Sequence, residues 1–294
     1  MRPTWRVILS IAVILALTSV LAVAQEIAAV EEEEEEEVIE EESSDLTAGG
    51  TAAFFSHYMW RGESLSDGAV FEPDGWVSYK GLTVDVWGNY EMENTQWTEI
   101  DFTASYAFTA ANINWEVGYV YYGVLDVQRE PEEPGEPSDE PADEPPEDEE
   151  PEEEEDVGAL RSHEIFISAG FENILNPTIT TYIDVEEGVG AFIEGSVGYD
   201  IPLYEEASLT LGGTVGLNIK DGYVGVNDEG EEYTGFHHME ISASASLPVW
   251  KLSVEPLIAY TFPLSDNAKQ AIKGFSIDGH SSHFWGGVSV SIEF

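Results

Sequence analysis

The chain of 294 residues contains no cysteine, which excludes disulfide bonds, thiolate metal sites and a lipid anchor attached through cysteine. Basic residues are also scarce, with 10 Lys and Arg against 59 Asp and Glu and a formal net charge of -49. Such a charge repels phosphate backbones, so nucleic acid is a poor partner. Long apolar runs are missing except at the amino terminus, and this disfavours a helical membrane protein.

The amino terminus has the features of a secretory signal peptide. Arg2 and Arg6 precede an apolar segment from Val7 to Val23, and Ala22-Val23-Ala24 supplies the small residues of a cleavage site. We therefore expect residues 1–24 to be removed on export. An uncleaved membrane anchor is the alternative, because the apolar segment has about the minimum length that crosses a bilayer.

Much of the negative charge lies in two low-complexity tracts. The first includes an unbroken run from Glu31 to Glu37, and we expect residues 25–48 to form a disordered periplasmic tail. The second alternates Pro with Glu and Asp, and we expect residues 127–157 to form an extended extracellular loop. Neither tract can build a core, so residues 49–294 should hold the folded domain around this loop.

The rest of the chain divides into segments close to the length of membrane strands, about 9–11 residues, in which apolar and polar positions alternate. In one of them, Leu82, Val84 and Val86 share a face, and Asp85 and Asn89 share the other. We predict an all-β fold, a transmembrane antiparallel up-and-down β-barrel of about 12 strands. The predicted strands are residues 51–61, 70–79, 82–92, 97–110, 113–125, 163–173, 178–185, 191–203, 209–220, 238–250, 252–264 and 283–294.

The connections between these segments alternate between short and long. Outer-membrane barrels have short periplasmic turns and longer outer loops, whereas a soluble β-protein has no reason to alternate in this way. Aromatic residues also gather near the strand ends, as in the girdles at the two membrane interfaces, although packing in a β-sandwich would give a similar pattern. The long connections are residues 62–69, 127–159, 221–236 and 265–282.

The last predicted strand resembles the terminal strand of bacterial outer-membrane barrels. From Phe284 to Phe294 every second residue is apolar or glycine, and the sequence stops on an aromatic residue. In those barrels the final Phe is part of the signal that the barrel-insertion machinery reads, and the resemblance gives this role to Phe294. It implies the bacterial outer membrane as the location, with outer-membrane lipid and the insertion machinery as partners.

The segment from Ser56 to Ser66 resembles the first strand and loop of the TorF-type porin family, which shows a Tyr-x-Trp-Arg-Gly-x-Ser pattern there. The following segment, Trp76 to Trp87, looks like the next hairpin of that family. The acidic Pro/Glu insert departs from the family pattern. The resemblance implies an outer-membrane channel for small solutes, without a defined substrate. The matching motif residues are Tyr58, Trp60, Arg61 and Gly62.

In a barrel of this kind the polar face of each strand lines the lumen, and here that face is mostly acidic. Carboxylates in a confined pore favour cations, although crowding raises their pKa values and weakens the field. Alternatively, these acids only hydrate a plugged interior, because narrow barrels are often filled by side chains. The predicted pore-lining residues are Asp85, Asn89, Glu91, Glu99, Asp101, Glu116, Glu194, Lys220, Glu240 and Glu255.

The leading functional prediction is an outer-membrane channel for passive diffusion of small hydrophilic solutes, with a preference for cations. The alternative is a closed structural or surface-interaction barrel, whose acidic outer loops bind divalent cations or surface partners. A water-wide path along the barrel axis would favour the channel, and a plug of side chains would favour the alternative. The sequence leaves the solute, the pore radius and the oligomeric state open.

We predict no enzymatic activity, no cofactor and no metal site. A lipid-cleaving barrel enzyme needs a Ser–His pair held by a third polar group, and the segment from His280 to His283 shows no such partner. A Gly-x-Ser-x-Gly motif is also missing. His280 with His283, or His237 with His238, are candidate metal ligands, but isolated loop histidines rarely bind a metal.

Overall fold

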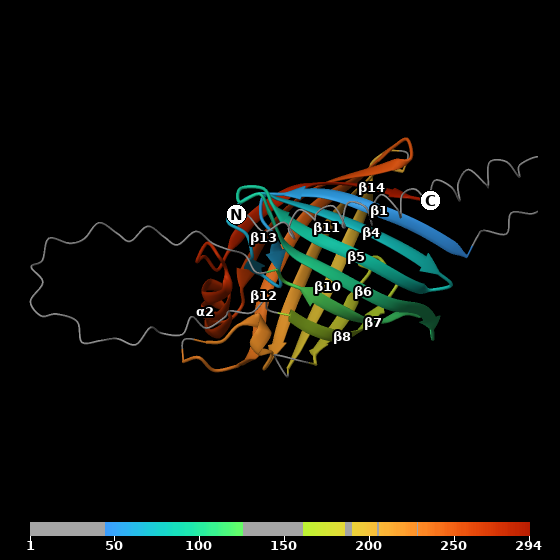
Figure 1. Ribbon diagram of the computed structural model, residues 1–294. Coiled ribbons are helices and arrows are strands. Elements are labelled where there is room, and N and C mark those ends of the chain that lie inside the picture. Colours follow the sequence, from blue (N-terminus) through green and yellow to red (C-terminus); the bar gives the residue numbers. More distant parts are fainter. Residues whose placement is uncertain (1–44, 126–160, 186–189, 205, 228) are drawn as a thin grey trace, which may run out of the picture.

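The computed structural model describes residues 45–125, 161–185, 190–204, 206–227 and 229–294. Twelve antiparallel strands close into a barrel, in which each strand pairs with its neighbours in sequence and β14 pairs with β1 (Figure 1). This confirms the predicted all-β, up-and-down barrel of 12 strands. The predicted signal peptide and nearly all of both acidic tracts lie outside the described residues.

The barrel wall consists of strands of 7 to 16 residues, and the described parts of the connections hold two further strands and two helices. The two strands outside the wall are β2 (Met59–Trp60) and β3 (Glu63–Ser64), and the helices are η1 (Gly222–Val224) and α2 (Asp266–Phe275). The wall strands are β1 (Leu46–Phe55), β4 (Val70–Tyr79), β5 (Leu82–Glu91), β6 (Gln96–Ala110), β7 (Ile113–Gly123), β8 (Arg161–Gly170), β9 (Thr178–Asp184), β10 (Ala191–Pro202), β11 (Ser208–Ile219), β12 (Thr234–Val249), β13 (Leu252–Pro263) and β14 (His283–Glu293).

The connections give the barrel two different ends. At one end, which we call the turn end, two residues join β4 to β5 and β6 to β7. Lys80 and Gly81 in the first turn have φ of 51° and 86°, and Ala111 and Asn112 in the second have φ of 55° and 59°. Positive φ at both positions is typical of type I′ turns, which match the twist of a hairpin. The opposite end, the loop end, holds the connections after β1, β11 and β13, which include β2, β3, η1 and α2.

The wall has an apolar outer face and a polar inner face, which is the reverse of the arrangement in a soluble protein. On β6, Phe102 and Tyr106 are 49% and 47% exposed, whereas Asp101 and Ser105 beside them are 8% and 6% exposed. Alternate side chains of a strand point to opposite faces, so the apolar row faces outward and the polar row faces the interior. No helix in the described part of the chain is long and apolar enough to cross a bilayer.

Ten of the predicted strands agree with the structure to within three residues at each end. The first does not: β1 begins at Leu46, before the predicted domain start at residue 49, and ends at Phe55. The chain then leaves the wall, because β2 and β3 pair only with each other. The apolar residues after Phe55 that suggested a longer strand therefore have a different environment.

The predicted start of the strand at residue 238 was also wrong, because β12 begins four residues earlier at Thr234. The pairing of β11 with β12 shifts register here: Val215 pairs with Met239, but Leu217 pairs with Phe236. Two residues of β12 therefore face one residue of β11, which is a β-bulge. The bulge buries two consecutive side chains, His237 and His238, which simple alternation does not predict.

Candidate functional site

The connection between β1 and β4 folds into the barrel interior as a small hairpin, which we call the plug hairpin and define as residues 58–66. Its turn consists of Arg61 and Gly62, with φ of 47° and 93°. A Cβ atom on Gly62 would lie 2.8 Å from Cβ of His238, so this approach to the wall at β12 requires glycine. The family-like motif thus forms one local structure, in which Tyr58, Trp60, Arg61 and Gly62 all belong to the plug hairpin.

Arg61 attaches the plug hairpin to the wall through an ion pair. Its Nη1 and Nη2 atoms donate hydrogen bonds to Oε1 and Oε2 of Glu164 on β8, at 2.7 Å and 2.6 Å. The hydroxyl of Tyr122 on β7 donates a third bond to Glu164, at 2.8 Å. The side chains of Arg61 and Glu164 are 5% and 0% exposed. This two-pronged geometry suits a planar guanidinium, and a lysine would not reproduce it.

The guanidinium of Arg61 also contacts three aromatic rings. Its Cζ atom lies 4.5 Å from the ring centre of Trp60, 4.6 Å from that of Tyr182 and 4.7 Å from that of Phe192. Rings at this distance stabilise a cation through their π faces. Asp221, which follows β11, lies 3.7 Å from Nη1 and adds a second negative charge. The described interior of the loop end is therefore arranged around the buried guanidinium of Arg61.

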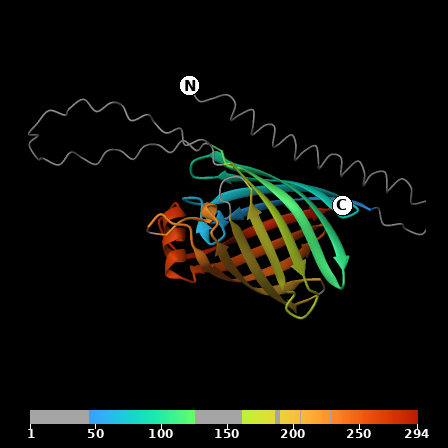
Figure 2. The same cartoon turned by 90° about the horizontal axis from the view of Figure 1, so that it is seen from below.

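Further hydrogen bonds join the plug hairpin to the other loop-end connections. The backbone N–H of Ser64 donates to Oγ of Ser276 at 3.0 Å, and the N–H of Ile277 donates to the carbonyl oxygen of Ser64 at 2.9 Å. Both partners follow α2, whose Ser265 cap and Asp266 begin the helix. Figure 2 shows α2 at the same end of the barrel as the plug hairpin. The hairpin is thus held from the wall and from the helix side.

Glu63 is the one carboxylate of the plug hairpin, and it is fully buried. Among the described residues neither of its side-chain oxygens has a hydrogen-bond partner, and its nearest ionisable partner is His237, with Nε2 3.7 Å from Oε1. Burial raises the pKa of Glu63 well above its usual range, although the charge of Arg61 opposes this. Burial likewise raises the pKa of Asp221 to about 6, against the lowering effect of Arg61. Both carboxyl groups therefore gain protons more readily than exposed ones.

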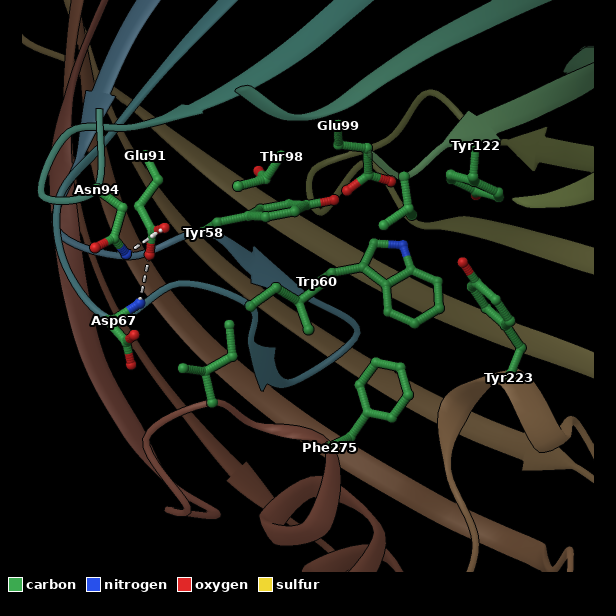
Figure 3. Close-up of a pocket in the computed structure, with 13 residues that line it drawn as sticks. Tyr58, Trp60, Asp67, Glu91, Asn94, Thr98, Glu99, Tyr122, Tyr223 and Phe275 are labelled. Carbon is green, nitrogen blue, oxygen red and sulfur yellow. Dashed lines mark hydrogen bonds between the residues drawn. The ribbon is translucent and has the colours of Figure 1, made fainter. Parts of the chain in front are cut away.

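A cavity of about 230 Å³ lies between the plug hairpin and the wall at β5, β6 and β7 (Figure 3). Tyr58 and Trp60 reach it from the hairpin, and Tyr122 reaches it from β7. Tyr223 of η1 and Phe275 at the end of α2 approach from the loop side. The remaining lining residues are Leu65, Asp67, Glu91, Asn94, Thr98, Glu99, Val124 and Ile277.

The structure places four of the predicted pore-lining residues close to the plug hairpin. Asn89, Glu91, Glu99 and Asp101 are at most 8% exposed, and Oε1 of Glu91 accepts a hydrogen bond from the N–H of Asp67. Four others lie on the inner rows of the wall and are partly exposed, and two have exposed side chains. The partly exposed ones are Asp85, Glu116, Glu194 and Glu240. The exposed ones are Glu255 on β13 and Lys220, which lies just beyond β11.

The partners of Arg61 were not predicted from the sequence. Glu164 carries a usable signal, because the inward row of β8 is Ser162, Glu164, Phe166 and Ser168, with one charge among neutral residues. An arginine buried inside a barrel requires such a partner. Asp221 carries no comparable signal, because it lies in a connection whose path depends on the tertiary fold.

The terminal residue and the histidines have local partners. The N–H of Phe294 donates to the carbonyl oxygen of Ala48 at 2.9 Å, which ties the end of the chain to β1. Nε2 of His283 lies 3.2 Å from Oδ1 of Asp278, and the rings of His237 and His238 pack against Phe192. Among the described residues no three His, Cys, Asp or Glu side chains are grouped so that they could hold a metal ion.

No family model and no curated protein matches the chain, so the resemblance to the TorF-type family stays a prediction. Solved structures with a similar course include an outer-membrane channel of Pseudomonas putida F1, described as COG4313, at 10% identity and a TM-score of 0.43, covering 87% of this chain and 100% of that one. Salmonella typhi OmpF in complex with daunomycin gives 7% identity and a TM-score of 0.36, covering 85% and 97%. Pseudomonas aeruginosa OprD shows 13% identity and a TM-score of 0.34, and the match covers 85% of this chain and 66% of that one. Because these TM-scores are low, the barrel fold is established by the strand pairing of this chain and not by the comparisons.

Proposed function

We propose that the protein is a bacterial outer-membrane channel for small hydrophilic solutes, narrowed at the loop end by the plug hairpin and selective for cations. The inverted faces of the wall support the membrane location. Ile165, Leu211 and Ile258 lie on three different strands and are 52%, 47% and 56% exposed. An apolar belt around a polar interior is characteristic of membrane barrels and would be a liability in water.

The charge of the inner wall is the observation that carries the proposal. Inward positions of β4 to β8 hold a series of carboxylates, and among the lysine and arginine side chains whose burial the structure describes, only that of Arg61 is buried. Since Arg61 is already paired with Glu164, it adds little positive potential to the lumen. A pore lined by carboxylates attracts cations and repels anions. The inward carboxylates on these strands are Glu72, Asp74, Asp85, Glu91, Glu99, Asp101, Glu116 and Glu164.

The test is conductance of the purified protein in planar bilayers under a gradient of potassium chloride. The expected reversal potential lies on the cation side, and the double variant Asp85→Asn/Glu116→Gln should move it toward zero, because two inner carboxyl groups are removed. Asp266→Asn is the matched control, since it removes an acid from α2 and leaves the inner wall unchanged. Anion selectivity of the native protein would overturn the proposal.

A closed barrel with a role at the cell surface is the second candidate. It is favoured by the number of contacts that hold the plug hairpin, which include the bonds of Ser64 to Ser276 and Ile277. A variant in which a short Gly/Ser linker replaces residues 57–68 separates the two functions. If the native protein is silent and the variant conducts, the barrel is closed in its resting state. If both conduct and the variant conducts more, the hairpin is a constriction.

A further inference from the structure

We infer that the cavity beside the plug hairpin binds a small organic cation of the alkylated ammonium class. This deepens the proposed function, on which it rests, by naming the class of cation that the loop end recognises. The cavity is lined by five aromatic side chains from four separate elements, which the folded barrel brings together (Figure 3). They are Tyr58 and Trp60 of the plug hairpin, Tyr122 of β7, Tyr223 of η1 and Phe275 of α2.

The ring of Trp60 stands steeply to the rings of Tyr122 and Tyr223, which are themselves closer to parallel, at 27° and with centres 6.5 Å apart. The ring of Trp60 meets that of Tyr122 at 77° and that of Tyr223 at 88°, with ring centres 6.2 Å and 5.6 Å apart. Rings arranged in this way offer π faces and edges on more than one side of a guest. Aromatic enclosures of this kind are the common protein solution for quaternary ammonium ions. The guanidinium of Arg61 over Trp60 shows that the same cluster already stabilises one cation.

The polar part of the lining is negative. Asp67, Glu91 and Glu99 contribute carboxylates, and none of the thirteen described lining residues is a lysine or arginine. The hydroxyl of Tyr58 points toward Glu99 in Figure 3. Burial raises the pKa of Tyr58 well above its usual range, and Glu99 and Asp101 raise it further, so the phenol stays neutral. A cation in the cavity would therefore be attracted by acidic side chains, which no basic side chain of the described lining neutralises.

The apolar lining favours an organic cation over a bare metal ion. Leu65, Val124 and Ile277 add aliphatic surface to the five rings. A hard metal ion requires several oxygen ligands within about 2.6 Å, and apolar walls cannot replace its water shell. Methyl groups on nitrogen, in contrast, spread the charge and gain from contact with apolar surface. The size of the cavity also exceeds what a single ion fills.

A trimethylammonium group occurs both in free solutes and in lipid headgroups. The carboxylates of Asp67, Glu91 and Glu99 would repel the phosphate of a phosphocholine headgroup. The cavity therefore favours a solute that carries the cation without an adjacent anion. Choline is a suitable probe for the free solute, and glycerophosphocholine is a suitable probe for the headgroup.

Isothermal titration calorimetry on the full chain in a choline-free detergent tests the inference. Choline should bind at least about 10-fold more tightly than 3,3-dimethylbutan-1-ol, which has the same shape but no charge. Contact of one positive charge with aromatic faces and a carboxylate lowers the dissociation constant by about this factor. Glycerophosphocholine should bind more weakly than choline. Equal binding of choline and its isostere, or no binding of choline, would overturn the inference, and tighter binding of glycerophosphocholine would transfer it to a lipid headgroup.

Two variants assign the binding to this cavity. Glu99→Gln removes one of the three carboxyl groups that line the cavity, and Tyr223→Leu removes one aromatic ring, on a connection outside the wall. Each should weaken choline binding by roughly 5-fold, within the range of single cation–π contacts. Tyr260→Leu is the matched control, because Tyr260 is an exposed ring on the outer face of β13. All variants must keep the heat-modifiable gel shift of a folded barrel. Unchanged affinity in both cavity variants would place the binding elsewhere and refute the inference.

The failures of the two proposals differ. If choline does not bind but the reversal potential in potassium chloride stays on the cation side, only the inference about the cavity fails. If choline binds and the channel prefers anions, the proposed conduction fails and the binding site remains.

Discussion

The two ends of the barrel interior are built from different side chains. At the loop end the inward positions hold large aromatic or charged groups, and Glu164, Phe192 and His237 have no exposed surface. Toward the turn end the inward rows of β10 to β14 hold small residues that are partly exposed, such as Gly212 and Ser244. The wall has the same architecture at both ends. The difference therefore comes from the side chains and from the plug hairpin.

If the barrel is the proposed channel, this contrast predicts that it discriminates between ions at the loop end. A small residue on a strand adds little to the sheet and leaves space beside it, whereas buried charged pairs require defined geometry and give specificity rather than stability. The loop end carries the Arg61 ion pair, the aromatic cavity and the buried Glu63. We expect substitutions there to change conduction strongly and substitutions toward the turn end to change it weakly.

Removing Arg61 should have the largest effect. Arg61→Ala leaves the buried Glu164 without its cationic partner, which costs about 3–5 kcal/mol, and this energy is lost from docking of the plug hairpin because the wall strands keep their pairing. The hairpin should then be released. Single-channel conductance should rise, and chymotrypsin should cut at Tyr58 or Trp60.

Lys80→Ala is the control for this experiment. Lys80 also pairs with a carboxylate, that of Asp45 at 3.1 Å, but both side chains are more than half exposed at the turn end. Such pairs contribute little to stability. Equal conductance and equal protease resistance in Arg61→Ala and in the native protein would show that the ion pair does not hold the hairpin.

The turn of the plug hairpin should be the next most sensitive position. Gly62→Ala adds a Cβ atom at φ of 93° and within 2.8 Å of His238. Gly230→Ala is a matched control with φ of 73° and no atom within 4 Å of its Cβ position. Backbone strain of about 1–2 kcal/mol is common to both variants. If Gly62→Ala weakens docking of the plug hairpin and changes conductance more than Gly230→Ala, the difference measures the close approach to β12. Similar conductance in the two variants would argue against that approach.

The wall was predictable from the sequence because its signals are local. Alternation within a strand and the two-residue turns depend only on near neighbours, and β4 (Val70–Tyr79) was predicted to the residue. The plug hairpin was not predicted, because Tyr58 and Trp60 continue the alternation of β1 while facing a cavity instead of the outside. Period alone cannot distinguish an apolar residue that faces lipid from one that faces another part of the same chain.

The site depends on contacts that no local pattern contains. Arg61 and Glu164 are 103 positions apart, and their pairing requires both the closed barrel and the inward fold of the hairpin. The bulge opposite Gly216, which buries His237 together with His238, interrupts the alternation that the prediction assumes. The acidic character of the inner wall could be predicted, but the position of the buried Arg61 could not.

Docking of the plug hairpin should also depend on pH, and this effect should be smaller than loss of Arg61. The groups that face Glu63 are Arg61, Asp221 and His237, and burial raises the pKa of Glu63 against the effect of Arg61. A carboxyl group with a raised pKa stabilises the docked state fully below its unfolded pKa and loses this stability as pH rises through the docked pKa. Asp221, with a pKa of about 6, acts in the same direction.

Conductance should therefore increase from acidic to alkaline pH in the native protein, as the hairpin docks less tightly. Glu63→Gln keeps the shape of the side chain without its titration and should reduce the pH dependence to the part that Asp221 contributes. Glu255→Gln, an exposed inward acid of β13, should leave the profile unchanged. A native conductance that falls with rising pH would contradict the assignment to Glu63.

The smallest effect is expected from a new charge toward the turn end. Thr210 lies on the inward row of β11, and its Oγ1 donates to Oδ1 of Asp200 at 2.6 Å. In Thr210→Lys the ammonium group can pair with Asp200 in contact with water, and salt screens its field over about 10 Å. Glu99→Gln changes the charge by the same amount inside the loop end, where burial leaves little water to screen it. Reversal potentials measured at two salt concentrations should shift more in Glu99→Gln than in Thr210→Lys. The opposite order would place selection at the turn end and reverse the comparison between the two halves of the interior.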